Sequence, residues 1–268
     1  MAGDQVKEAA RDAATSAPLR VLARGGYAAN GVVHALIGAI VLTIAFGARG
    51  ESDQAGAFLA IAGAPLGFVA LWTLALLMVA LGVWHVLEGI IVSRASDVKK
   101  WGVRVSEWGQ AAVFIALGVI AASVAMGARP DGDDAAKAAS RGVLSVAGGP
   151  WLLALIGLGI GIGGISFIVM GVLRSFENKV SVPSGPMGGV VTALGVVGFI
   201  AKGIALAIVG VLLVVAAVKV DAETAGGLDG AIQALLGVYL GPLLVGLVGA
   251  GFVAYGIFCL FRARYARL

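Results

Sequence analysis

Three stretches of similar sequence decide the fold: GYAANGVVHALIG at residues 26–38, EWGQAAVFIALG at 107–118 and GFIAKGIALAIVG at 198–210. Shifts of 80 and then 92 residues superpose their last glycines, Gly38, Gly118 and Gly210. The same shifts superpose three polar residues, Asn30, Gln110 and Lys202. Self-similarity at such spacings is the signature of an internal repeat, so the sequence predicts one structural unit used three times.

The composition around these stretches is that of a membrane protein. Of 268 residues, 60% are hydrophobic and 13% are charged, and the mean hydropathy is +1.01. Soluble domains carry roughly 25% charged residues. An ordinary soluble enzyme, a disordered tail and a disulfide-rich secreted domain are therefore excluded, and the single cysteine, Cys259, allows no internal disulfide.

A membrane-spanning helix needs about 20 mainly apolar residues. Six such stretches are present, at about 26–48, 64–93, 105–127, 150–173, 193–218 and 238–261. They predict an all-α integral membrane protein with six transmembrane helices. Since the repeat covers two spans, the helices are predicted to form three parallel helical hairpins with pseudo-threefold symmetry.

The predicted organisation is a polar N-terminal helix over residues 1–23, then hairpin repeats over 24–98, 99–180 and 181–268, the last with a basic tail. The connection inside each hairpin begins polar and becomes weakly apolar, which predicts a short surface helix capped by Asp, Ser or Thr. Pro65, Pro150 and Pro242 mark the entry to the second helix of each hairpin. The register of these second helices stays open.

At this level the chain resembles a known family, the uncharacterised actinobacterial membrane proteins described as domain of unknown function 1206. The resemblance rests on Arg24 ahead of GYAANGVVHALIG, a short outer segment, and a Gly-rich second helix ending near a basic residue. Three copies cover nearly the whole chain. The third departs from the pattern, with Val196 where Arg24 and Arg104 stand. The resemblance implies the fold and no activity, and it provides no catalytic residues to carry over.

The distribution of lysine and arginine predicts the orientation, because these residues collect on the cytoplasmic side of membrane proteins. The two ends of the chain and the connections after even-numbered spans hold thirteen of them, against five in the other connections. We therefore expect a multi-pass protein of the plasma membrane with cytoplasmic N- and C-termini. The net charge of +4 then faces anionic lipid and requires no nucleic-acid partner. Arg262, Arg264 and Arg267 of the basic tail are predicted to contact lipid headgroups.

Ionisable residues inside a span are functional candidates by default. Counted at 1.5 Å per residue from the basic anchors Arg24, Arg94 and Arg104, a layer of polar side chains lies about 9–15 Å deep. It consists of Asn30, His34, His85, Glu88 and Gln110, and the repeat places Lys202 in the same layer. Outside this layer, Glu107 lies one helical turn from Arg104, and we expect these two to pair at the membrane surface.

Three functions are compatible with this layer. The first is a structural, accessory or partner-binding membrane protein, whose partners are the lipid bilayer and another membrane protein or complex, with the polar residues acting as packing contacts. The second is a small-ion or proton pathway using Glu88, His34 and His85, with Lys202 in the same layer. The third is a redox subunit in which His34 and His85 ligate haem b. The sequence favours the first, a non-enzymatic protein without cofactor, catalytic residues or metal site, because it shows no phosphate loop, metalloprotease helix, nucleophile elbow or zinc-type cysteine cluster.

Overall fold

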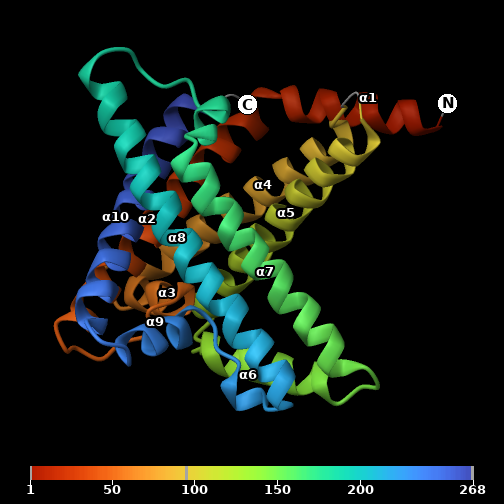
Figure 1. Cartoon of the computed structure of the whole chain (residues 1–268). Coiled ribbons are helices and arrows are strands. Elements are labelled where there is room, and N and C mark those ends of the chain that lie inside the picture. The colour runs from red at the N-terminus through yellow and green to blue at the C-terminus, as the bar shows by residue number, and fades with distance from the viewer. Residues whose placement is uncertain (1, 94–95, 267–268) are drawn as a thin grey trace. The chain divides into compact units, whose positions relative to one another are not determined.

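The computed structural model describes residues 2–93 and 96–266, and every regular element in these ranges is a helix (Figure 1). Their order is α1 (Ala2–Thr15), α2 (Ala17–Ala45), α3 (Gln54–Ala62), α4 (Gly67–Ile91), α5 (Asp97–Ala125), α6 (Gly132–Leu144), α7 (Gly149–Val172), η1 (Ser175–Lys179), α8 (Pro186–Lys219), η2 (Ala222–Thr224), α9 (Leu228–Leu236) and α10 (Gly241–Tyr265). Within the described ranges six helices, α2, α4, α5, α7, α8 and α10, are long and apolar enough to cross a membrane. The predicted all-α, six-span fold is thus confirmed. The basic residues Arg94 and Arg267 lie outside the described residues.

The N-terminal segment divides differently from the predicted 1–23. The polar helix α1 ends at Thr15, and the first spanning helix already begins at Ala17. Pro18 is the second residue of α2, a position where proline's fixed φ favours a helix and its missing N–H costs nothing. Residues 17–23 therefore extend the first span instead of continuing the polar helix.

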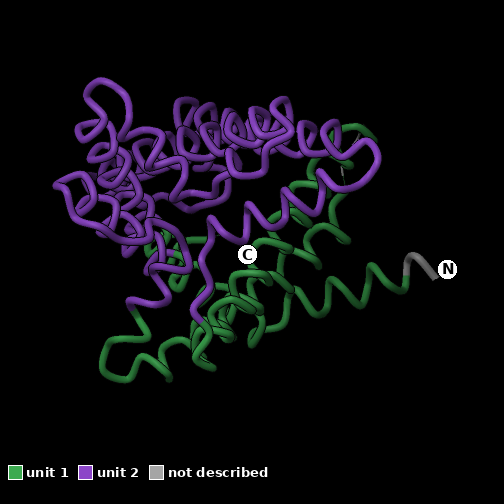
Figure 2. Tube along the Cα trace, turned by 90° about the horizontal axis from the view of Figure 1, so that it is seen from below, with its two compact units in different colours: residues 1–30, 61–128, 259–268 green, residues 31–60, 129–258 purple. Residues whose placement is uncertain are grey.

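The chain forms two compact units, each described separately (Figure 2). Unit 1 comprises residues 1–30, 61–128 and 259–268; unit 2 comprises 31–60 and 129–258. Within unit 1, α4 packs along α5, and α1 packs on α4. Within unit 2, α7 packs along α8, and the short α6, α9 and η2 adjoin them.

Close helix pairing depends on glycines that let two backbones touch. The pairs are α4–α5, α7–α8, and the part of α2 in unit 2 with α10. Each uses glycines from both helices, among them Gly82 and Gly118, Gly164 and Gly210, and Gly256 and Gly38. A Cβ on Gly210 would lie 2.6 Å from the backbone nitrogen of Gly161, and one on Gly38 would lie 2.6 Å from that of Val253. Small residues allow such approach in membrane helices, where packing drives association. Each pair joins the second span of one repeat to the first span of another.

A left-handed turn before each second span gives the register in which the three second spans superpose. Leu66, Gly148 and Leu240 each adopt a left-handed backbone conformation, with φ of 63°, 77° and 63°, directly before α4, α7 and α10. These positions are 82 and then 92 residues apart. Pro65 precedes this turn whereas Pro150 and Pro242 follow it, so the three prolines are not equivalent positions.

Acidic side chains at or just before the first turns of α3, α6 and α9 connect these three short helices. Asp229 of α9 accepts hydrogen bonds from Ser52 before α3, with Oγ at 2.7 Å. Asp133 of α6 accepts from the backbone nitrogens of Gly227 and Gly230 at 2.8 and 3.1 Å. The carboxylate of Asp53, the residue before α3, lies against Gly132 at the start of α6. Asp229 and Asp133 thereby accept hydrogen bonds from donors at the start of another helix, where the helix dipole favours negative charge.

Burial raises the pKa of the Asp53 carboxyl, and the Asp229 and Asp131 carboxylates add to the rise against hydrogen bonds from Gly56 and Ala55. Burial and the same neighbours also raise the pKa of Glu51. A carboxyl with a raised pKa in the folded state favours folding when protonated, so its contribution is complete below about pH 4 and is lost as the pH rises through the folded-state value.

We therefore expect Asp53→Asn to raise the melting temperature in detergent at pH 7 and to change it little at pH 4. Asparagine keeps an oxygen for the backbone N–H of Gly56 and caps helices as well as aspartate. Tryptophan-fluorescence melts from pH 4 to 8 measure the difference. A larger gain at pH 4 than at pH 7 would contradict the sign argued here.

Candidate functional site

Two imidazole-centred pairs lie within the spanning helices, one in each unit. We name them the His85 pair, His85 with Glu107, and the His34 pair, His34 with Lys202. Both histidines belong to the predicted polar layer, and each meets a side chain that can carry charge.

The His85 pair joins α4 to α5. The distance from His85 Nδ1 to Glu107 Oε2 is 2.6 Å, and the two residues are 2% and 7% exposed. Phe114 stacks on the imidazole with ring centroids 5.5 Å apart, and Tyr27 contacts the imidazole edge-to-face at 6.3 Å. The pair is thus enclosed by aromatic rings, and the hydrogen bond is as short as charge-assisted ones in proteins.

The surrounding helix contact explains why these side chains meet. Gly82 and Gly118 bring α4 and α5 together: a Cβ on Gly82 would lie 2.6 Å from the Ile115 side chain, and one on Gly118 would lie 3.0 Å from the Ala75 carbonyl oxygen. Nearer the connection between the two helices, Arg104 donates to the carbonyl oxygens of Gly89 and Ile90 at 3.1 and 3.5 Å. The expected pairing of Glu107 with Arg104 is therefore replaced by one with His85.

The His34 pair joins α2 to α8. Lys202 Nζ lies 3.2 Å from His34 Nε2, and since an ammonium can only donate, a charged Lys202 requires an unprotonated Nε2. Lys202 Nζ also lies 4.5 Å from the ring centroid of Tyr255 and 5.3 Å from that of Phe167. His34 is 3% exposed and packs on Tyr255 and Phe252. A cation in an apolar span gains from such ring faces because water is absent.

The remaining predicted residues of the layer have other roles. Asn30 is buried, and its Nδ2 donates to Cys259 Sγ at 3.4 Å. Gln110 donates to the Ser106 carbonyl oxygen of its own helix at 3.4 Å. Glu88 is half-buried on α4, one turn beyond His85. Asn30, Gln110 and Lys202, which the repeat superposes, thus make three different contacts.

The basic tail contacts the first span of unit 1. The Arg262 guanidinium lies 4.1 Å from the Tyr27 ring centroid and donates to the Tyr27 hydroxyl at 3.1 Å. Arg24 donates to the carbonyl oxygen of Arg264, whose own side chain is exposed. Contact of Arg262 and Arg264 with lipid headgroups stays a prediction, and Arg267 lies outside the described residues.

Glu107 and Tyr27 are the residues that sequence reasoning missed as parts of the site. The repeat shifts place Tyr27, Glu107 and Phe199 at one position. Since the other two copies have aromatic rings at this position, the repeat indicates that the Glu107 carboxylate is buried. Its short distance from Arg104 along the chain does not reveal this. On the opposing helices, the register of the second spans superposes His85, Phe167 and Cys259.

Comparison with known proteins agrees with the three copies. The family model Domain of Unknown Function (DUF1206) matches three times, at residues 25–91, 108–174 and 197–266. The Uncharacterized protein YxxB of Bacillus subtilis (strain 168) is 26% identical over 249 residues, which cover 91% of this chain and 90% of that protein. No solved structure matches the chain. The chain therefore has three copies of the sequence unit that defines this family.

Proposed function

Because the chain belongs to the DUF1206 family, whose definition carries no activity, we propose a function from its own side chains: transfer of protons, or of a small ion coupled to protons, across the membrane. The observation that carries the proposal is the 2.6 Å hydrogen bond between His85 and Glu107 inside two spanning helices. A proton in that bond can reside on the imidazole or on the carboxylate. Intramembrane acid and imidazole groups are typical of proton relays.

The repeat supports a functional origin for this pair. The positions equivalent to His85 and Glu107 in the α7–α8 pair are Phe167 and Phe199, whose rings stack with centroids 5.6 Å apart. The equivalent contact between α7 and α8 is thus made by two apolar rings in place of an ionisable pair, with Lys202 Nζ 5.3 Å from the Phe167 ring centroid. Burying a hydrogen-bonded ionisable pair is often no more stabilising than apolar packing of similar volume. The fold itself therefore does not require His85 and Glu107.

The His34 pair supports the same proposal from unit 2. Lys202 occupies the position held by Asn30 and Gln110 in the other copies, and His34 occupies that of Phe114 and Leu206. An ammonium and an imidazole at 3.2 Å compete for protonation, because the uptake of a proton by His34 brings two positive charges together. Such a pair can release a proton when its surroundings change. We propose that both histidines carry protons and do not ligate haem, so that the protein acts without a cofactor and without covalent catalysis.

We propose that both termini face the cytoplasm at the plasma membrane. The support is the excess of lysine and arginine, thirteen against five, in the termini and the connections after even-numbered spans. The resulting pathway would run between the cytoplasm and the opposite side of the membrane.

The test is reconstitution of the purified full chain into liposomes that contain a pH-sensitive dye. We expect an imposed potential to drive proton flux, and Glu107→Gln to lower its rate by about a hundredfold, the scale at which positioned proton-transfer groups act. Glu177→Gln is the matched control, because Glu177 lies on η1, outside the spans, where it accepts a hydrogen bond from Thr192 of α8. An absorption spectrum of the same preparation should show no Soret band.

Flux that is absent, or equal in wild type and Glu107→Gln, would reject the proposal. The accessory role would then be the better explanation, and purification in gentle detergent should recover a second membrane protein with this one. Flux that is lost in Glu88→Gln but kept in Glu107→Gln would move the pathway to the glutamate predicted from the sequence.

A further inference from the structure

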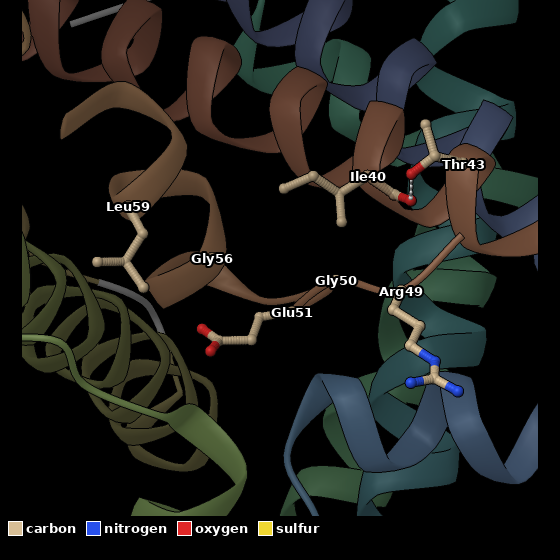
Figure 3. A pocket seen from close by; sticks show the side chains of 7 residues that line it. All are labelled: Ile40, Thr43, Arg49, Gly50, Glu51, Gly56 and Leu59. Atoms are coloured by element: carbon tan, nitrogen blue, oxygen red, sulfur yellow. Dashed lines mark hydrogen bonds between the residues drawn. The ribbon is translucent and has the colours of Figure 1, made fainter. Parts of the chain in front are cut away.

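A pocket lies in unit 2 where the first span ends and the short helix α3 begins. Its volume is about 570 Å³, and it is lined by Ile40, Thr43, Arg49, Gly50, Glu51, Gly56 and Leu59. Figure 3 shows Arg49 and Glu51 on either side of Gly50, with Ile40 and Leu59 lining the same hollow. The volume falls within the range of small-molecule sites, about 300–1,000 Å³.

The two charged side chains of this pocket are available to a ligand. Both Arg49 and Glu51 are exposed. Throughout residues 2–93 and 96–266, neither side chain has a hydrogen-bond or ion-pair partner. They therefore offer a guanidinium and a carboxylate that do not neutralise each other.

Comparison with the second repeat shows that Glu51 does not cap a helix, although the residue at its equivalent position does. The shift of 80 residues superposes Arg49 on Arg129 and Glu51 on Asp131. Asp131 caps α6, with its Oδ1 accepting from the backbone nitrogens of Asp133 and Asp134 at 2.9 and 3.0 Å. In the first repeat Asp53 performs the equivalent task by accepting from Gly56 at 2.9 Å. Helix capping therefore does not explain the presence of a carboxylate at Glu51.

The position of the pocket suits an amphiphile. Ile40 lies within the spanning helix α2, which ends at Ala45, and Leu59 lies on α3. The charged residues follow the end of the span, where the hydrocarbon of the membrane meets its polar headgroups. A ligand with an apolar body and a dipolar head could contact both groups at once.

We propose that this pocket binds a phospholipid with a primary amine, holding its phosphate on Arg49, its ammonium on Glu51 and its glycerol and first acyl carbons on Ile40 and Leu59. Guanidinium pairs with phosphate through two parallel N–H···O bonds. A primary ammonium donates hydrogen bonds to a carboxylate, whereas a quaternary amine has no N–H to donate. The site therefore prefers phosphatidylethanolamine to phosphatidylcholine, and to phosphatidylglycerol, which lacks an amine.

The electrostatic surroundings of Glu51 agree with a cationic ligand group. Although Glu51 is exposed, partial loss of hydration raises its pKa, and the carboxylates of Asp53, Asp131 and Asp229 contribute to the rise. An ammonium placed there would relieve the repulsion among these acids. Binding should weaken as the pH falls and Glu51 becomes protonated.

Titration of the full chain in detergent with each of the three lipids, followed by native mass spectrometry, tests the proposal. We expect Arg49→Gln to weaken binding of the first phosphatidylethanolamine about tenfold, as expected for one charge-assisted contact. Glu51→Gln should weaken phosphatidylethanolamine and leave phosphatidylcholine unchanged. Arg129→Gln, at the equivalent position of the second repeat, is the matched control and should change nothing.

Equal weakening by Arg49→Gln and Arg129→Gln would show nonspecific attraction to basic loops and overturn the proposal. So would a Glu51→Gln effect of the same size on all three lipids. Soluble glycerophosphoethanolamine distinguishes lipid from free headgroup: if it binds as tightly as the lipid, the ligand is a solute and the lipid assignment is wrong. Unchanged melting temperatures of the three variants exclude misfolding as the cause.

Discussion

Leucine in place of Gly164 is expected to destabilise the folded protein strongly, whereas leucine in place of the adjacent Gly163 is expected to preserve its stability. A Cβ on Gly164 would lie 2.6 Å from the backbone nitrogen of Ala207 and 2.7 Å from the carbonyl oxygen of Gly203. Neither backbone atom can move without separating α7 from α8. A Cβ on Gly163 meets no atom within 4 Å. The overpacked variant should lose about 3 kcal/mol or more, the upper end of such substitutions.

The yield of monodisperse protein after detergent extraction and its melting temperature measure this difference. The two sites are neighbours on one helix, so both variants carry the same change in helix propensity and hydrophobicity. Equal losses at Gly163 and Gly164 would contradict the packing of α7 on α8 through glycine. Two variants that are both as stable as the wild type would contradict this packing as well.

Phenylalanine in place of Glu107 is expected to destabilise the protein by about 3–5 kcal/mol, the cost of breaking a buried pair by removing one partner. His85 would keep its position without the acceptor that now lies 2.6 Å from Nδ1. The double variant His85→Phe/Glu107→Phe should recover most of this loss. It copies the contact that Phe167 and Phe199 make at the equivalent positions.

The double variant separates folding from function. We expect its melting temperature to return close to that of the wild type while proton flux stays at background. A double variant as unstable as Glu107→Phe would show that two phenylalanines cannot replace the pair as they do at the equivalent positions. The fold would then need His85 and Glu107. Recovery of both stability and flux would show that the pair is dispensable for transport.

The spans and the repeat follow from the sequence because they depend on local properties, namely runs of about 20 apolar residues and glycines at fixed spacings. His34 and His85 lie on α2 and α4, two of the candidate spanning helices, whereas their depth in the membrane stays a prediction. The partners of these residues could not be predicted in this way. Helical spacing allowed Glu107 to meet Arg104, but it says nothing of His85, which another helix brings within 2.6 Å.

Local sequence patterns also do not predict which helices pack against each other. Glycines on both faces of α7 satisfy the same small-residue spacing. A Cβ on Gly164 would nevertheless meet the backbone of α8, whereas one on Gly159 or Gly163 would meet no atom within 4 Å. Only the placement of the neighbouring helix decides which face is used. The register of the second spans likewise follows from the left-handed turns at Leu66, Gly148 and Leu240, whereas the prolines near them stand at different steps of the turn.

The bond between Ser52 and Asp229 has a consequence for synthesis. These residues are 177 positions apart, in the first and third repeats. In a linear array each repeat contacts only its neighbours, so the array can grow or shrink from either end. Here a ribosome must deliver the last third of the chain before the start of α3 receives its acceptor, so maturation of the earliest-made repeat waits for the latest.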